Sequence, residues 1–484
     1  MVDGKVLAAR FAGAADFETR KVISGGNELE IFFLDGLTSS GDIADFIVRP
    51  LHEARQDERE ETLFTRAERG LVWCASMKEA SSTDEAAELL VNGFCVILFP
   101  KSGKALGCEV KTGEKRSPSA PEAENTVKGA KDAFTETLRT NTSLIRRHLR
   151  TPELRLEESV VGRRSLTKVT VCWVEGLTDP ELPARMKKRL GEIDIDGLLS
   201  PAAVEEYVTG ARKTAFPLLE FTERTDHFCQ GLLDGQVGLL VDGLPIGYLA
   251  PVSFGRLMRS PEDRATDYLS ASMLRILRYL ASFFAMTLPG FYLAVTNFHT
   301  QILPTTLLLS FAEARQGVPF PAVVEVLIME LSFELLREAG VRLPGAMGNT
   351  IGIVGGLIIG QAAVEANLVS PIVVIVISFT ALCSFAIPNE EFATAFRILK
   401  FFFIAVCAWL GYFGMLLGLL AVLTHLSHLT SFGIPYLMPF VGADLNDYED
   451  ERDFIWRQPF RKLRKRPIYA NPKERTKLTF SKKR

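Results

Sequence analysis

The sequence GNTIGIVGGLIIG occupies residues 348–360 of this 484-residue chain. Glycines recur every four residues, so a helix would carry them as one stripe: Gly348, Gly352, Gly356 and Gly360. In water, each glycine would destabilise a helix by about 1 kcal/mol relative to alanine. In a membrane, a glycine stripe lets a second helix approach closely. We therefore predict a packing helix near residues 347–365, inside a bundle of membrane helices.

Apolar sequence dominates the second half of the chain. Hydrophobic residues make up 47% of the whole, but beyond about residue 270 they become nearly continuous. We predict an α-helical multi-pass membrane domain over residues 272–430, because about 20 apolar residues are needed to cross a bilayer as a helix. The predicted spans lie near residues 279–299, 347–365, 371–388 and 401–424.

The region between the first two spans, residues 302–345, is too charged for an ordinary lipid-facing helix. Four polar residues form one stripe on a helix that starts near Pro321; they are Glu330, Glu334, Arg337 and Glu338. This region is either amphipathic and interfacial, with these side chains solvated, or re-entrant, with its charges inside the bundle. The second alternative makes candidate pore or gating residues of Glu330, Glu334, Asn349 and Gln361.

The charges around the spans predict the orientation of the chain. Arg275 and Arg278 precede the first span, and positive charge favours the cytoplasmic side. The N-terminal sequence MVDGKVLAAR lacks the apolar core of a signal peptide, so we expect the N-terminal half in the cytoplasm. Four spans would return the chain to that side, with both termini cytoplasmic. NEEFATAFRILK (389–400) is interpreted as a charged turn, although its Arg397 and Lys400 fit a four-span scheme awkwardly.

The N-terminal half predicts two similar α/β subdomains. Residues 1–28 are interpreted as a leader, 29–112 as the first subdomain, 113–125 as a polar linker and 126–262 as the second subdomain. IFFLDGLTSSGDIADFIVRPL (31–51) is matched by VTVCWVEGLTDPELPARMKKRL (169–190), and LLVNGFCVILFP (89–100) by LLDGQVGLLVDG (232–243). The two pairs of blocks occur in the same order and are separated by nearly the same number of residues, which indicates an internal duplication. The alternative is chance recurrence of a common strand–turn–helix pattern.

Two polar segments of the second subdomain are candidates for binding or catalytic sites. Residues 130–154 are predicted to form one long helix, whose arginines (Arg139, Arg146, Arg147 and Arg150) we expect to face solvent or the other subdomain rather than phosphate or membrane. In TERTDH (222–227), the residues Glu223, Asp226 and His227 resemble an acid–base cluster. No nucleophile or second metal ligand accompanies them, so a solvated turn is the favoured interpretation.

Catalytic and metal-binding motifs are missing from the sequence. No Walker loop, GxGxxG, HExxH or GxSxG occurs, so we predict no enzyme, catalytic residue or cofactor site. The seven cysteines are scattered without CxxC, which favours reduced core thiols over disulfides or zinc, so no metal site is predicted. We predict that residues 431–484 form an acidic and then basic cytoplasmic tail. The last 28 residues carry twelve Lys or Arg and one Glu, which favours anionic lipid as a partner, and no nucleic acid is expected.

A run of motifs in one order carries a family resemblance. They are AFTETLRTNTSLIRRHLRTPEL, VEGLTDPEL, IDIDGLL, TERTD, LLDGQVGLLVDG, SPED, GVPFPAVVEVLIMELSFELLREAGVRLP, IVGGLIIGQAAVEANLVSP and SFGIPYLMPF. Over about residues 130–445 the chain closely resembles the A-subunit family of spore nutrient-germinant receptors, the GerA family, with a looser match back to residue 29. The family includes related stage V sporulation AF-type proteins. In TERTD, Thr225 stands where members commonly carry proline, which bears on turn rigidity only.

The resemblance implies a location, partners and an activity. It implies a membrane protein of the spore inner membrane or the cell membrane that works with a transporter-like B subunit and a lipoprotein C subunit. The A subunit of this family is thought to form a homo-oligomeric ring that conducts ions when germination is triggered. Two hypotheses follow: a nutrient-gated ion channel subunit, or a non-conducting scaffold or signalling subunit. A transporter in its own right is disfavoured because paired inverted repeats are not evident.

Overall fold

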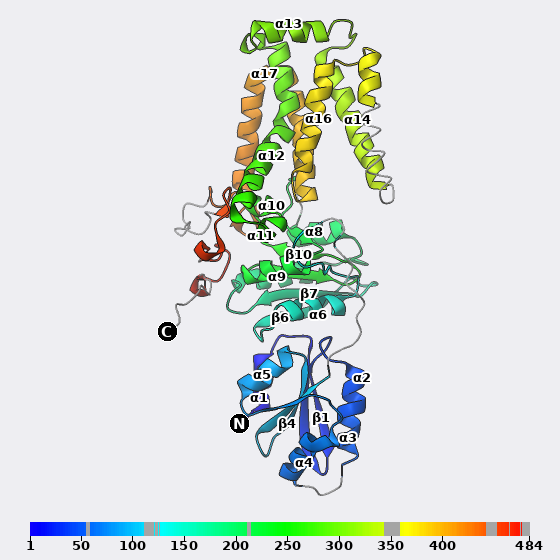
Figure 1. Cartoon of the computed structure of the whole chain (residues 1–484), viewed down its shortest axis with the longest axis vertical. Helices are drawn as coiled ribbons and strands as arrows, with labels where there is room; N and C mark the ends of the chain where they lie inside the picture. Colours follow the sequence, from blue (N-terminus) through cyan, green and yellow to red (C-terminus); the bar gives the residue numbers. More distant parts are fainter. Residues whose placement is uncertain are drawn as a thin grey trace.

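The computed structural model describes residues 1–54, 59–110, 121, 124, 126–210, 214–342, 359–441, 453–463, 465–474 and 476. Three parts follow one another along the long axis of the molecule: a first β-sheet, a second β-sheet and a bundle of helices (Figure 1). The predicted fold class, two similar α/β subdomains followed by a helical region with apolar helices, is confirmed. Most of the predicted linker 113–125 lies outside the described residues.

The first subdomain is a five-stranded antiparallel sheet of order β1-β2-β4-β5-β3. Its strands are β1 (Phe17–Ser24), β2 (Asn27–Leu34), β3 (Met77–Ala80), β4 (Phe94–Phe99) and β5 (Lys104–Glu109). Its helical segments are α1 (Gly4–Arg10), α2 (Ser40–Asp42), η1 (Ile43–Val48), α3 (Arg49–His52), α4 (Glu60–Arg66), η2 (Ala67–Leu71) and α5 (Thr83–Val91). Successive β4 side chains enter two cores, with Ile97 on one face and Val96 on the other, which explains its unbroken apolar sequence.

The predicted leader, residues 1–28, is wrong as an interpretation of this segment. Helix α1 starts at an Asp3 side chain that accepts a hydrogen bond from the Lys5 amide. Strand β1 pairs with β2 along its whole length. The weak hydrophobic patterning has a physical reason: β1 is an edge strand, so most of its side chains stay exposed to solvent.

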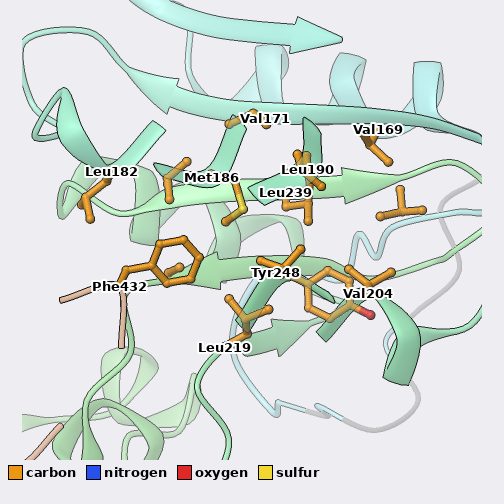
Figure 2. Close-up of a cluster of buried hydrophobic side chains, with 14 of the residues drawn as sticks. Val169, Val171, Leu182, Met186, Leu190, Val204, Leu219, Leu239, Tyr248 and Phe432 are labelled. Carbon is orange, nitrogen blue, oxygen red and sulfur yellow. The ribbon is translucent and has the colours of Figure 1, made fainter. Parts of the chain in front are cut away.

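The second subdomain repeats this arrangement in a sheet of order β6-β7-β9-β10-β8. Its strands are β6 (Leu154–Val161), β7 (Thr167–Val174), β8 (Glu220–Thr222), β9 (Val237–Val241) and β10 (Gly247–Ala250). Its helices are α6 (Leu138–His148), α7 (Glu181–Gly191), α8 (Pro201–Thr209) and α9 (Thr225–Leu233). Figure 2 shows one of its cores, where Met186 of α7 and Val204 of α8 gather around Leu239 and Tyr248 of the sheet.

The two sheets share one topology, as the internal repeat predicted. In each, a hairpin of two strands is followed by helices, a short third strand, a helix and a second pair of strands. The matched sequence blocks fall on equivalent elements: the first block on β2 and β7, and the second on β4 and β9. The two subdomains are therefore similar in the order and pairing of all their strands, and not only in the two matched sequence blocks.

The segment that begins the second subdomain differs from the long helix predicted over residues 130–154. Only α6 is helical there, because the chain before Leu138 is held in an extended path by hydrogen bonds from Phe134 N to Glu223 O (2.8 Å) and from Gly243 N to Glu136 O (2.8 Å). Arg146 of α6 makes the expected contact with the other subdomain. Its guanidinium binds both carboxylate oxygens of Asp16, at 2.7 and 2.8 Å, and both side chains are buried.

The helical region begins after two short helices, α10 (Phe254–Leu257) and α11 (Glu262–Ala265). Its helices are α12 (Tyr268–Asn297), α13 (Thr305–Ala314), α14 (Ala322–Arg342), a short helix over 359–365, α16 (Pro371–Phe385) and α17 (Glu390–His428), with a 3-10 turn η3 (Thr300–Ile302). Within the described residues, α12 and α17 are long and apolar enough to cross a membrane, whereas α13 and α16 are shorter apolar helices. The predicted amphipathic region 302–345 thus contains α13 and α14.

Helix α17 reverses direction within its length. Gly411 has φ 58° and ψ −141°, outside the helical region. A Cβ placed on Gly418 would lie 2.8 Å from the Phe403 ring, although 15 residues of continuous helix would separate these positions by about 22 Å. The chain therefore forms two antiparallel arms, a first arm over 390–410 and a second arm over 412–428.

This reversal corrects two predictions. The predicted span 401–424 is wrong as a single helix, because the turn at Gly411 lies in its middle. The predicted charged turn at 389–400 is also wrong, since helix begins at Glu390 behind an Asn389 cap whose side chain accepts a hydrogen bond from Phe392 N at 2.9 Å. Both arms are apolar, so hydropathy averaged along the sequence does not reveal that the chain reverses direction.

The C-terminal segment returns to the second subdomain (Figure 1). A short hairpin of β11 (Thr430–Ser431) and β12 (Ile434–Pro435) places Phe432 in the core of that subdomain (Figure 2). Further on, past the 3-10 turn η5 (Phe460–Lys462) and before η6 (Pro472–Glu474), Ala470 is buried and pairs with Thr178. The described part of the predicted basic tail therefore lies partly against protein.

Candidate functional site

A cluster of charged side chains lies between α14 and the first arm of α17. Lys400 Nζ forms an ion pair with Glu330 Oε2 and lies 3.3 Å from Glu334 Oε1. Arg397 Nη1 lies 3.3 Å from the other Glu334 oxygen. Glu330 and Lys400 are 1% and 5% exposed, so these charges have been removed from solvent. We call Glu330, Glu334, Arg337, Arg397 and Lys400 the charged cluster.

Helical spacing explains how the cluster assembles. Glu330 and Glu334 are four residues apart on α14, and Arg397 and Lys400 are three apart on α17, so each pair lies on one helix face. The two helices run antiparallel here, since Lys400 meets Glu330 while Arg397 meets Glu334. Arg337 completes the cluster from α14, with Nη2 donating to Ser384 Oγ of α16 at 2.8 Å.

A second polar contact anchors the first turn of α14, on the N-terminal side of the charged cluster. Glu325 is fully buried, and its Oε2 accepts a hydrogen bond from the Ser370 amide at 2.8 Å. Its Oε1 lies 3.2 Å from Arg315 Nη2. Between these two polar contacts, Val326 and Met329 pack into an apolar core shared with α12 and α16. Helix α14 is therefore held by buried charges in its first turn and near its middle, and by apolar contacts between them.

The cluster is not completely satisfied within the described part of the chain. Glu330 Oε1 and Arg397 Nε are buried and have no hydrogen-bond partner among the described residues. Buried polar atoms without a partner are costly, and charged groups within a membrane bundle commonly mark ion pathways or moving elements. This arrangement can hold α14 against α17, and it can attract an ion or water if the helices separate.

The predicted candidate residues fall into three groups. Glu330 and Glu334 are brought together in the charged cluster. Gln361 is exposed in the helix over 359–365, where its Nε2 donates to Glu365 Oε1 at 2.9 Å, and it takes no part in the cluster. The remaining predicted pore residue, Asn349, lies outside the described residues.

The glycine stripe is described at one position only, since Gly348, Gly352 and Gly356 lie outside the described residues. A Cβ on Gly360 would lie 3.4 Å from Val374 of α16, an ordinary contact. Another glycine of the bundle lies closer to a neighbouring backbone. A Cβ on Gly290 of α12 would lie 2.9 Å from the carbonyl oxygen of Phe403.

The cluster residues that lie outside the predicted polar stripe are Arg397 and Lys400. They appeared as flanking charges before a span, whereas the structure places them as partners of the α14 carboxylates. The signal available in the sequence was their spacing of three, which matches a helix face opposite a pair of acids. Arg275 and Arg278 are likewise paired in the structure. Both contact Asp263, which is 1% exposed, and Arg275 also contacts Asp453.

The TERTDH segment is a buried ionic junction, which corrects its interpretation as a solvated turn. His227 Nε2 lies 2.9 Å from Glu220 Oε1, and Arg256 of α10 pairs with the other oxygen. Burial alone would raise the pKa of Glu220, but the Arg256 and His227 charges outweigh it and hold that pKa at about 2. This network joins the second subdomain to the helices that lead into α12.

No metal-binding arrangement is found in the described part of the chain, where no three His, Cys, Asp or Glu side chains are grouped to hold an ion. A cleft of about 1000 Å³ lies where α6 meets the first subdomain, with Glu85 and Glu88 on one wall and Arg147 and Arg150 on the other. These charges are separated from the charged cluster by the whole second subdomain (Figure 1).

Comparisons with known proteins cover nearly the whole chain. The family model described as the Bacillus/Clostridium GerA spore germination protein matches residues 5–469. The membrane protein YfkQ of Bacillus subtilis (strain 168) is 37% identical over 440 residues, covering 90% of this chain and 84% of that protein. Spore germination protein KA of the same organism is 35% identical, with 93% and 82% covered. Spore germination protein GerLA of Bacillus cereus is 36% identical, with 95% and 93% covered.

The N-terminal half is also similar to a solved structure. That structure is the N-terminal domain of the A subunit of the Bacillus megaterium spore germinant receptor GerK3, at 25% identity and a TM-score of 0.41. The match covers 52% of this chain and 93% of that domain.

Proposed function

This chain belongs to the GerA family of spore germination proteins, and from that premise we propose that it is the A subunit of a germinant receptor that conducts ions when germination is triggered. The single observation that carries the ion-conducting role is the charged cluster. Its charges are enclosed among apolar helices, where a purely structural bundle has no need of them.

The proposed placement in the membrane follows from helix lengths and directions. Helix α12 and the two arms of α17 are each roughly 25–45 Å long at 1.5 Å per residue, enough to cross or nearly cross a hydrocarbon core of about 30 Å. Exposed apolar side chains would face lipid or a neighbouring subunit; they include Ile375, Phe385, Trp409, Phe413 and Leu420.

Both ends of the described helical region lie beside the second subdomain. Helix α12 starts there, and the second arm of α17 ends there, with His425 Nε2 2.9 Å from Thr214 Oγ1. The soluble half and the C-terminal segment would therefore share one side of the membrane. We propose that this side is the cytoplasm, and that the protein is a multi-pass component of the spore inner membrane or the cell membrane.

The charged cluster supports a closed arrangement of the bundle. While Lys400 pairs with Glu330, α14 is fixed against the first arm of α17 and the enclosed charges are shielded from ions. Opening would separate these helices and let water reach the same charges. The free energy that separates the two states would come from nutrient binding to partner subunits, since a ligand shifts an equilibrium only by its differential affinity for the two states.

The proposed partners are a transporter-like B subunit, a lipoprotein C subunit and further copies of this chain in a membrane ring. Anionic lipid is proposed to bind the exposed cations of the C-terminal segment, at about 1 kcal/mol per charge near the surface. Arg461 and Lys462 in η5 are exposed and accessible to such headgroups.

The experiment that tests this function is ion retention by liposomes. The purified full-length protein is reconstituted into liposomes loaded with potassium chloride, and potassium efflux is recorded with an electrode. We expect retention by the wild type and efflux from Lys400→Met, which leaves Glu330 without its partner. Glu365→Gln makes a carboxylate-to-amide change at an exposed position and should behave as wild type. If no variant of the cluster ever releases potassium, the non-conducting scaffold is the correct function.

A further inference from the structure

The C-terminal segment is held at two separate places on the rest of the molecule. We call its described residues, 453–463 and 465–474, the strap. The first part of the strap lies against α10 and α12, and its last part lies against two turns of the second subdomain. Figure 1 shows the strap, in red, beside the junction between the soluble half and the helices. The strap therefore links the second subdomain to the start of α12 through contacts of its own.

Asp453 forms the centre of the first anchor. Its Oδ1 lies 3.0 Å from Arg275 Nη1 of α12, and its carbonyl oxygen accepts hydrogen bonds from Arg275 Nη1 at 3.0 Å and from Arg259 Nη2 at 2.9 Å. Arg275 Nη2 also lies 3.3 Å from Asp263 Oδ2 of α11, and the Arg275 side chain is buried. Because a buried arginine is destabilised when an acidic partner is removed, Asp453 helps to fix the start of α12.

Two buried side chains of the strap extend this first anchor. Phe454 lies over Gly255 of α10, where an added Cβ would collide with the ring, and its ring centroid is 5.4 Å from that of Tyr279 in α12. The Arg457 amide donates a hydrogen bond to Ser272 Oγ of α12 at 3.1 Å. The first anchor therefore contacts both the short helix before α12 and α12 itself.

The second anchor fills the space between two turns of the second subdomain. Ala470 is fully buried, and a Cβ on Gly235 would lie 2.7 Å from the Ala470 Cβ. The Asn471 amide donates a hydrogen bond to Leu177 O at 2.8 Å, and Tyr469 packs in the core of that subdomain. Because Ala470 lies against the backbone of a glycine, a large side chain at this position would force the strap away.

We propose that the strap is an autoinhibitory latch, which holds the start of α12 against the second subdomain and is released when the channel opens. The proposal rests on the proposed function, since it concerns the movement that lets ions pass. Gly290 of α12 lies so close to the first arm of α17 that an added Cβ would be 2.9 Å from Phe403 O. Lys400 lies about one turn earlier on that arm. A shift of α12 would therefore move the arm that carries Lys400.

A latch with two anchors predicts that the anchors depend on each other. While one anchor is in place, it keeps the other part of the strap at a high effective concentration beside its own binding surface. A substitution at one anchor should therefore loosen the contacts at the other. A segment that only covers two unrelated surfaces would show no such effect.

Hydrogen–deuterium exchange of the purified full-length protein in detergent measures this dependence. Ala470→Arg disrupts the second anchor, and we expect peptides that cover α10 and α11 (residues 254–266) to exchange about tenfold faster than in the wild type. In the reciprocal variant Asp453→Asn, peptides over 465–474 should exchange faster. Glu474→Gln makes the same carboxylate-to-amide change at an exposed position of the strap and should exchange as the wild type does.

Peptides of the β1–β2 hairpin, residues 17–34, show whether each variant is folded, since the hairpin is remote from the strap (Figure 1). If exchange over 254–266 is unchanged in Ala470→Arg and exchange over 465–474 is unchanged in Asp453→Asn, the anchors are independent and the proposal is wrong.

The autoinhibitory role is tested with liposomes loaded with potassium chloride. We expect Asp453→Asn to release potassium and Glu474→Gln to retain it. If Lys400→Met releases potassium but Asp453→Asn retains it, the strap is not a latch, although the proposed function stands. If both variants retain potassium, the proposed function fails and the autoinhibitory role fails with it, while the exchange result still decides whether the two anchors are coupled.

Discussion

Lys400 on the first arm of α17 forms a buried ion pair with Glu330 on α14, inside a bundle made otherwise mainly of apolar side chains. Removing one partner of such a pair costs about 3–5 kcal/mol, because the other charge remains buried without compensation. Replacing both partners by apolar residues is often neutral. Single substitutions of this pair should therefore destabilise the protein strongly, whereas the double apolar substitution should have little effect on stability.

The contact between the two subdomains should depend on one ion pair. Asp16→Asn leaves Arg146 buried without its bidentate partner and should lower the free energy of unfolding by about 3–5 kcal/mol. Denaturant unfolding of the full-length protein measures this change. As a control, Asp194→Asn breaks an exposed pair with Arg163 and should change stability by less than about 1 kcal/mol. Equal effects of the two substitutions would contradict the importance given to burial.

Helix packing at glycine should follow the space available at each position. Gly290→Ala places a methyl group 2.9 Å from the Phe403 carbonyl oxygen, so two backbones must separate, at about 1–3 kcal/mol. Gly360→Ala meets Val374 at 3.4 Å and should be mild. Thermal unfolding in detergent compares the two variants. If they are equally stable, close backbone approach does not limit packing in this bundle.

The glycine stripe itself remains a prediction. If Gly356 faces a neighbouring helix, germination or ion release should worsen stepwise through Gly356→Ala, Gly356→Val and Gly356→Leu. Val354→Leu, which replaces an apolar residue on the opposite face by one a methylene larger, is the control and should be mild. A response that does not grow with side-chain size would instead indicate that these glycines provide flexibility.

The contact between His148 and Asp132, which we call the histidine clamp, predicts a dependence of stability on pH. His148 Nε2 lies 2.7 Å from Asp132 Oδ2, and this hydrogen bond raises the pKa of His148 and lowers that of Asp132 to about 2. The clamp is fully present below the unfolded histidine pKa of about 6.5 and is lost as pH rises through the raised pKa. Asp132 stays ionised throughout this range.

The contribution of the clamp to the free energy of unfolding is measured by urea unfolding between pH 5.5 and 8.5. Wild type should lose stability as pH rises, and His148→Gln should remove part of that slope. His52→Gln, at an exposed histidine, should leave it unchanged. The clamp has no role if His148→Gln keeps the full wild-type slope.

The proposed membrane topology is tested by the accessibility of introduced cysteines to a labelling reagent. Cysteines introduced at Ser117 and Ser481 should be protected from a membrane-impermeant maleimide in intact cells and labelled after lysis, because we place both regions in the cytoplasm. Labelling of either residue before lysis would show that the proposed orientation is wrong.

Much of the fold could be predicted from local patterns. The repeated strand–turn–helix blocks identified the two subdomains, because β4 and β9 are buried along their whole length and so have distinctly apolar sequences. The edge strand β1 was missed for the opposite reason, since most of its residues face solvent. The reversal at Gly411 could not be predicted from hydropathy, because it depends on the left-handed conformation of one glycine between two apolar arms.

The site was predictable on one helix only. Glu330 and Glu334 stood out because carboxylates in an apolar region are rare. Their partners Arg397 and Lys400 are more than 60 residues away, in a segment whose charges predict a turn. Only the tertiary pairing of α14 with the first arm of α17 shows that these charges compensate one another.

Potassium retention by liposomes that carry single and double cluster variants tests the central claim most directly. Breaking the pair should shift the closed-to-open equilibrium by roughly a hundredfold or more, since each 1.4 kcal/mol is a factor of ten. We predict that Glu330→Gln and Lys400→Met each release potassium, whereas Glu330→Leu combined with Lys400→Leu restores retention, because an apolar contact again holds α14 against α17. If the single variants retain potassium, or if the double variant leaks as much as they do, this ion pair does not hold the channel closed.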